Sequence, residues 1–229
     1  LTRAASLRQQ IVTSGVSKYN VGTGSWQRPA SVSSVILVPG QVEDDASIRY
    51  GAPGINRNLD LLKAVRASNP DAYVVYKPHP DVLAGLRKKG QQEELVESYC
   101  DEVVLHVPIN RLLEQVDAVH VMTSLTGFEA LLRGLRVVCY GQPFYAGWGL
   151  TDDIIAAPRR QRRLSLDQLV AGALILYPTY ISQMTSRYTT PEQALEELKL
   201  ARKTAAPTVS GWVTLRRKVL ALLASARRH

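Results

Sequence analysis

The sequence predicts an α/β fold built on a doubly wound parallel β-sheet. Short apolar runs alternate along the chain with segments whose apolar residues have helical spacing. The apolar runs are continuous rather than alternating with polar residues, which is typical of strands buried on both faces. The predicted strands are 34–38, 72–76, 102–107, 118–122 and 136–141, and the predicted helices between them are 58–68, 91–99, 110–116 and 127–134. Such a Rossmann-like sheet binds ligands at the carboxyl ends of its strands.

Segments on either side of this series predict two further parts. Thr2–Ser14 has apolar residues at helical spacing and is followed by glycine, so it is predicted to form one helix. We therefore divide the chain into residues 1–31, a helix and linker from a preceding domain; 32–186, the sheet domain; and 187–229, C-terminal helices with a basic tail. Residues 166–178 are apolar nearly all round and too short to span a bilayer, which predicts a buried helix against the other domain.

Composition limits the kind of partner. The 229 residues, 45% hydrophobic and 21% charged, suffice for a packed core of one domain or slightly more. A formal charge of +8 favours an anionic partner: nucleic acid, an anionic membrane or a phosphorylated substrate. Nucleic acid is the least favoured, because aromatic residues are not interleaved with the arginines. Cys100 and Cys139 lack histidines at metal-site spacing and are predicted to be core thiols. The absence of a signal peptide or a long apolar run in the sequence predicts a cytoplasmic setting.

Polar and glycine-rich segments follow four of the predicted strands. They are 39–45, 77–81, 123–134 and 141–149. The carboxyl ends of parallel strands meet at one edge of a sheet, which is where a ligand is expected.

The segment TSLTGFEALLRG is suited to binding a phosphate. Thr123, Ser124 and Thr126 are helix-capping residue types, and Gly127 lets the backbone approach a ligand at the positive end of a helix dipole. Glu129 is placed to accept from ribose hydroxyls. The alternative is an ordinary capping box with no ligand.

The segment KPHPD places a histidine between two prolines directly after a strand. Proline biases the preceding residue away from helix, so His79, before Pro80, is held extended on a rigid mount. Beside Lys77, its imidazole can donate to a phosphate or assist a leaving group. The alternative is a solvated turn.

Three acids follow the first strand. Its end points Glu43 or Asp44 toward the same edge, where a carboxylate facing a nucleotide-sugar carbon can act as nucleophile or base in glycosyl transfer. The alternative is again a solvated turn.

Five segments together resemble the KpsC/LipB family of capsule polysaccharide proteins. They are PGQVEDDASIRYG, VYKPHPDV, TSLTGFEALLRG, CYGQPFYAGWGLT and LVAGALILYPTY, and the resemblance runs from about Tyr19 to about Pro191. It implies a retaining β-Kdo transferase that uses CMP-Kdo to build the poly-Kdo linker between capsule chains and a phosphatidylglycerol-type lipid. It also implies a GT-B fold, in which two Rossmann-like domains face a cleft, and a location in the cytoplasm peripheral to the inner membrane.

The resemblance assigns roles to residues of two short elements. The QxED element is Gln41, Glu43 and Asp44, and the HP element is His79 and Pro80. A retaining outcome by double displacement implies Asp44 as the nucleophile, with Glu43 as the second candidate. His79 would stabilise or protonate the departing phosphate.

The same resemblance implies a set of donor-binding residues. Ser124, Thr126 and the amides of the following helix would hold the CMP phosphate, and Glu129 would contact the ribose or a neighbouring polar group. Lys77 and Arg49 are candidates for the carboxylate of Kdo, although an arginine here can instead pair with the acidic loop. We expect no cofactor and no metal, because cations and a helix dipole can stabilise a monophosphate leaving group.

One βαβ series is visible where a GT-B module needs two. We therefore expect the acceptor half, or a second transferase module, to lie outside this sequence. The basic segments 158–163 and 211–229 predict either contact with anionic lipid, suited to a glycolipid acceptor, or a packed helix with a solvated basic face. Two other functions remain open: another GT-B enzyme of the teichoic-acid type, or a non-catalytic nucleotide- or membrane-binding domain.

Overall fold

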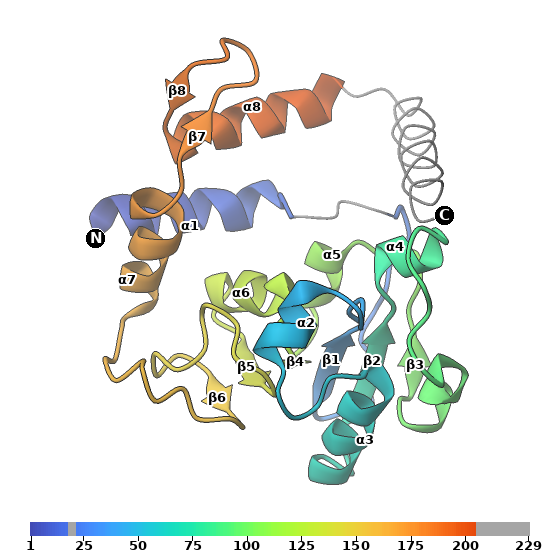
Figure 1. The fold of residues 1–229 in the computed structure, drawn as a ribbon. Coiled ribbons are helices and arrows are strands. Elements are labelled where there is room, and N and C mark those ends of the chain that lie inside the picture. Colours follow the sequence, from blue (N-terminus) through green and yellow to red (C-terminus); the bar gives the residue numbers. More distant parts are fainter. Residues whose placement is uncertain (18–21, 205–229) are drawn as a thin grey trace, which may run out of the picture.

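The computed structural model describes residues 1–17 and 22–204 and has a parallel β-sheet at its centre (Figure 1). The strands are β1 (Val35–Pro39), β2 (Tyr73–Lys77), β3 (Glu102–Val103), β4 (Ala118–Val121), β5 (Arg136–Cys139) and β6 (Asp152–Asp153). Their order in the sheet is β3-β2-β1-β4-β5-β6, and every neighbouring pair is parallel. This is the strand order of a Rossmann fold, so the predicted fold class is confirmed.

Helices cover both faces of the sheet. They are α2 (Ala46–Gly51), α3 (Asn58–Ser68), α4 (Pro80–Leu83), the 3₁₀-helix η1 (Glu93–Ser98), α5 (Ile109–Leu113) and α6 (Leu125–Leu132). In β1, Ile36 and Val38 join the core cluster that contains α3 residues, whereas Val35 and Leu37 join the one that contains α5 and α6 residues. All five residues of β1 are buried, which explains why its apolar run is continuous.

A second group of elements packs at one end of the sheet domain. It comprises α1 (Thr2–Ser14), α7 (Leu166–Val170), the π-helical segment η2 (Ala171–Leu176), α8 (Pro191–Thr204), and the antiparallel pair β7 (Tyr180–Ile181) and β8 (Tyr188–Thr189). Figure 1 shows α1 and α8 side by side above the sheet, joined to it through α7. Arg3 on α1 donates to both carboxylate oxygens of Glu192 on α8, at 2.8 and 3.0 Å. The predicted helix Thr2–Ser14 is confirmed, and Gly15 ends it in the left-handed region at φ 61°.

Several local expectations need correction. The predicted helix 166–178 is buried at Leu169 and Val170, but Leu176 and Tyr177 are 80% and 89% exposed. Its second half is only partly buried, with Ala173 and Leu174 packed against the core and also lining a groove. Cys139 is a core thiol as predicted, with burial raising its pKa to about 12, whereas Cys100 is half-buried.

Of the two basic segments, 158–163 lies within the described residues. In 158–163, Arg160 donates to the carbonyl oxygens of Pro143 and Ala146 and lies over the ring of Trp148, so it holds a loop together. The predicted basic tail 211–229 lies outside the described residues. Within the described ranges, no helix is both long and apolar enough to cross a bilayer.

Candidate functional site

A polar cavity of about 290 Å³ lies where the strand order reverses, at the carboxyl ends of β1 and β4. Sheets of this type bind ligands in that crevice. The wall is formed by the loops after β1, β2 and β4 and by the start of α6. Of the predicted site residues, it includes Gln41, Lys77, His79, Pro80, Thr123, Ser124, Thr126 and Glu129. The structure therefore brings together the polar residues of three segments that are far apart in the sequence.

Gln41 joins the loop after β1 to the loop after β4. Its side-chain amide donates to Thr123 Oγ1 and accepts from the Thr123 backbone N–H, both at 2.9 Å. Its own backbone N–H and carbonyl are bonded to the side chain of Asn58, each at 2.8 Å. Since Gln41 is 7% exposed, this network fixes the spacing of the two loops across the crevice.

Lys77, the last residue of β2, carries a buried ammonium group on the cavity wall. Lys77 is 7% exposed, and burial lowers its pKa from the usual value. Among the described residues, its one hydrogen-bond partner is the carbonyl oxygen of Leu105, 3.2 Å from Nζ. A buried ammonium bonded to a carbonyl rather than to a carboxylate is suited to an anionic ligand.

His79 is the N-cap of α4, and Pro80 is the first residue of that helix. The backbone N–H of Asp81 donates to His79 Nδ1 at 3.2 Å. In the neutral ring the proton then sits on Nε2, which is the atom able to donate to a phosphate oxygen. The prediction that His79 is held extended is confirmed by its φ of −65° and ψ of 134°.

Ser124 is the N-cap of α6, and its Oγ accepts from the Thr126 N–H at 3.2 Å. This places the positive end of the α6 dipole at the cavity. Gly127 does not line the cavity. A Cβ at Gly127 would overlap the hydroxyl of the buried Tyr145, which donates to the Ser124 carbonyl oxygen. The glycine therefore permits a contact that holds the α6 start in place.

The three acids after β1 have different environments. Both oxygens of Glu43 accept backbone N–H groups, from Asn58 at 2.8 Å and from Gln91 at 2.9 Å. Asp44 forms an ion pair of 2.7 Å with Arg87, which lowers the pKa of its carboxyl group. Of the three acids, Asp45 is the one on the cavity wall.

Two further predicted residues lie at or beyond the edge of the site. Glu129 is at the wall, and it also lines a neighbouring apolar groove. Arg49 is exposed, outside the cavity, with its guanidinium 5.5 Å from the ring centre of Tyr50. The arginine that pairs with the acidic loop is thus Arg87 rather than Arg49.

Sequence reasoning missed Arg87, Asp45 and the Gln41–Thr123 link. The link follows only once β1 and β4 are known to be neighbours, which the order of elements along the chain does not state. No short motif marks Arg87. Across the part of the chain described, no group of three or more His, Cys, Asp or Glu side chains is placed to hold a metal ion.

A family model described as "Capsule polysaccharide biosynthesis protein" matches residues 6–188. The chain belongs to this family. The predicted KpsC/LipB-type resemblance is thereby confirmed, and relatives and solved structures agree with it.

Two curated relatives cover most of this chain. The capsule polysaccharide modification protein LipA of Neisseria meningitidis serogroup A is 53% identical over 195 residues, 85% of this chain and 28% of LipA. The lipopolysaccharide-processing protein LpsZ of Rhizobium meliloti is 43% identical over 204 residues, 88% of this chain and 46% of LpsZ. The chain therefore spans less than half the length of either relative.

Two solved structures of Thermosulfurimonas dismutans KpsC share the fold. The β-Kdo 2,7 transferase superposes with a TM-score of 0.74 at 44% identity, over 88% of this chain and 62% of that one. The β-Kdo 2,4 transferase gives a TM-score of 0.76 at 33% identity, over 86% and 62%. The segments that form the polar cavity lie inside the region matched by the family model.

Proposed function

We propose that this chain is the donor-binding part of a retaining β-Kdo transferase that takes CMP-Kdo. In this proposal the whole protein builds the Kdo linker on a phosphatidylglycerol-type lipid for capsule polysaccharide export, at the inner face of the cytoplasmic membrane. The observation that carries the proposal is the meeting of Lys77, His79 and the α6 start in one cavity at the strand-order reversal. The identity to KpsC transferases supports the choice of sugar.

The phosphate of CMP fits the cationic side of the cavity. The Lys77 ammonium and the N-terminal end of α6 both favour negative charge, and Ser124 and Thr126 add hydroxyl groups. As the bond between the phosphate and the anomeric carbon breaks, its electron pair leaves with CMP. A proton from His79 Nε2, or a hydrogen bond from it, then stabilises the phosphate oxygen. Groups of this kind supply the stabilisation without a metal ion or cofactor, and we propose that none is needed.

A carboxylate is required as the nucleophile for a retaining double displacement. Its oxygen attacks the anomeric carbon as CMP departs. The acceptor hydroxyl later attacks the same carbon, passes its proton to a general base and releases the carboxylate. Asp44 is our proposed nucleophile, and it must leave Arg87 to reach the cavity. Asp45 already lies on the cavity wall and is the alternative. Glu43, held by two backbone N–H groups, is better suited to fixing the loop.

The donor assay that tests this function compares two activated donors. The full-length protein that contains this chain is incubated with CMP-Kdo or with CDP-glycerol, and nucleotide release with an acceptor lipid is quantified with and without EDTA. We expect release from CMP-Kdo alone, unchanged by EDTA. Release from CDP-glycerol instead would support the teichoic-acid type. Release from neither, with binding to anionic vesicles, would support a non-catalytic domain.

A further inference from the structure

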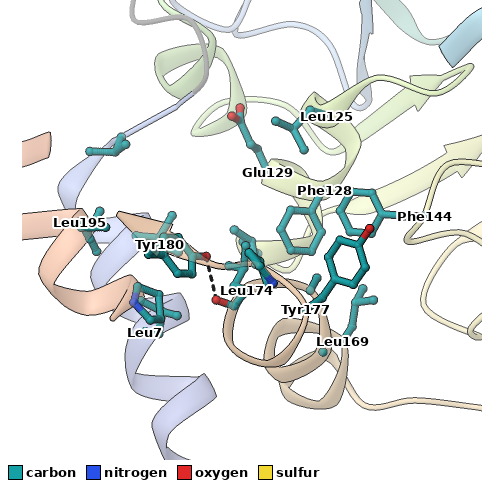
Figure 2. A pocket seen from close by; sticks show the side chains of 18 of the residues that line it. Leu7, Leu125, Phe128, Glu129, Phe144, Leu169, Leu174, Tyr177, Tyr180 and Leu195 are labelled. Atoms are coloured by element: carbon teal, nitrogen blue, oxygen red, sulfur yellow. Dashed lines mark hydrogen bonds between the residues drawn. The ribbon is translucent and has the colours of Figure 1, made fainter. Parts of the chain in front are cut away.

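An apolar groove of about 900 Å³ lies between the sheet domain and the α1–α8 layer. Its walls come from α1, α6, α7, η2 and α8, so residues from both ends of the described chain meet there. Figure 2 shows Leu7 and Leu195 on one side and Phe128 and Phe144 on the other, with Leu174 between them. A groove with such walls is suited to hydrocarbon.

The groove adjoins the polar cavity at the start of α6. Leu125, Glu129 and Phe144 line both. Figure 2 shows Leu125 and Glu129 together on α6 at one end of the groove. A ligand that occupies both compartments must have a polar end beside the α6 start and an apolar chain along the groove, which describes an amphiphile rather than a second sugar or a peptide.

Exposed apolar side chains mark another end of the groove. Tyr177 lines it and is 89% exposed, and the neighbouring Leu176 is 80% exposed. The hydroxyl of Tyr180 donates to the Leu174 carbonyl oxygen at 2.7 Å, so this backbone group of η2 is satisfied and does not compete with an apolar ligand. Exposed apolar rims of this kind are found at membrane and ligand sites as well as at protein–protein interfaces.

We propose that the groove binds the hydrocarbon chain of a lipid-linked acceptor and thereby holds the acceptor's polar end beside the donor cavity. This inference rests on the proposed function, because an acceptor is useful only next to a bound donor.

The test uses n-alkyl glucosides with six to nine carbons, below their critical micelle concentrations, titrated calorimetrically into this chain. Their neutral heads avoid repulsion from Glu129. Burial of each added methylene strengthens binding by about fourfold, so the nine-carbon glucoside should bind about sixtyfold more tightly than the six-carbon one.

Three variants locate the binding site. Ala173→Trp fills the groove, and Leu198→Arg places a charge on its wall at a position already 54% exposed, so the second variant is tolerated if the first fails to fold. Leu83→Arg is the matched control, since Leu83 is 45% exposed and lines neither the groove nor the polar cavity. We expect each groove variant to weaken binding of the nine-carbon glucoside at least tenfold and the control to leave it unchanged.

Binding without chain-length dependence, or weakened equally by the control, overturns the inference. So does self-association of the chain that the groove variants abolish while glucosides fail to bind, because the groove would then be an interface between copies. Loss of glucoside binding when the titration is repeated on the full-length protein also overturns it, because the groove would then be covered by the other GT-B domain. CMP is titrated into the same proteins. CMP binding with no glucoside binding leaves the proposed function standing, whereas glucoside binding without CMP binding counts against the function and not against the groove.

Discussion

Replacing Gly127 by alanine places a methyl group where the Tyr145 hydroxyl lies. Tyr145 is fully buried, and its hydroxyl donates to the Ser124 carbonyl oxygen, which also accepts the Gly127 N–H at 3.1 Å. The ring is packed against Phe128 and Phe144, so it has little room to move away. The substitution therefore strains the start of α6.

The change in the free energy of unfolding combines one stabilising effect and two destabilising effects. Alanine in a helix gains about 0.8–1.0 kcal/mol over glycine. Overpacking costs about 1–3 kcal/mol, and loss of the tyrosine hydrogen bond costs about 0.5–1.5 kcal/mol. We expect Gly127→Ala to lower the free energy of unfolding by about 2 kcal/mol.

A double-mutant cycle tests this reasoning. Urea unfolding is measured for the unchanged protein, Gly127→Ala, Tyr145→Phe and the double variant. Removing the hydroxyl relieves most of the overlap, so the double variant should be more stable than additivity predicts by about 1 kcal/mol or more. Additive effects within about 0.3 kcal/mol would refute the claim that the Tyr145 hydroxyl is why position 127 is glycine.

Three other expectations concern charge and chemistry. Lys77→Met should weaken CMP binding at least tenfold, whereas Lys88→Met, at an exposed position, should leave it unchanged. The affinity of the wild type for CMP should also fall with rising pH, because Lys77 loses its proton at its lowered pKa. Burial lowers the pKa of His120 to about 4 from an ordinary 6.5, so the unfolded state binds the extra proton. Stability should fall between pH 6.5 and 4 by about 3 kcal/mol more in the wild type than in His120→Leu, as measured by urea unfolding, and parallel pH curves would contradict this. In transfer assays of the full-length protein, Asp44→Asn should abolish sugar transfer while CMP binding is retained. If Asp45→Asn abolishes sugar transfer and Asp44→Asn does not, the nucleophile is Asp45.

The sheet could be predicted because its strands are buried on both faces and therefore read as continuous apolar runs. Val35 to Val38 is such a run. The glycine and polar residues that follow it, Gly40 and Gln41, indicated that the ligand crevice lies at the end of this strand. The strand predicted at 102–107 is confined to 102–103 in β3, and β6 at 152–153 was not predicted, because so few residues carry no period.

The lining of the polar cavity was predictable where a polar residue directly follows a predicted strand, as with Lys77 and Ser124. It was not predictable where a distant residue decides the outcome. Arg87 forms an ion pair with Asp44 but lies in a segment without a recognisable motif. The hydroxyl of Tyr145 leaves no room for a Cβ at position 127, which is why this residue is glycine. Residues 171–176 are apolar, and an apolar sequence does not distinguish a segment that faces a core from one that faces a groove. The predicted full burial of this segment was therefore wrong.

Calorimetric titration of CMP into this chain is the sharpest test of donor-phosphate binding in the polar cavity, with His79→Asn and His79→Ala as the paired variants. Asparagine keeps an oxygen that can accept the Asp81 N–H and so preserves the cap of α4, but it lacks the Nε2 proton donor. We expect CMP to bind and both variants to weaken its binding about tenfold or more, in line with loss of a hydrogen bond to a charged group. If CMP binds His79→Asn as tightly as the unchanged chain, His79 only caps a helix and the polar cavity does not bind the donor phosphate in the way proposed.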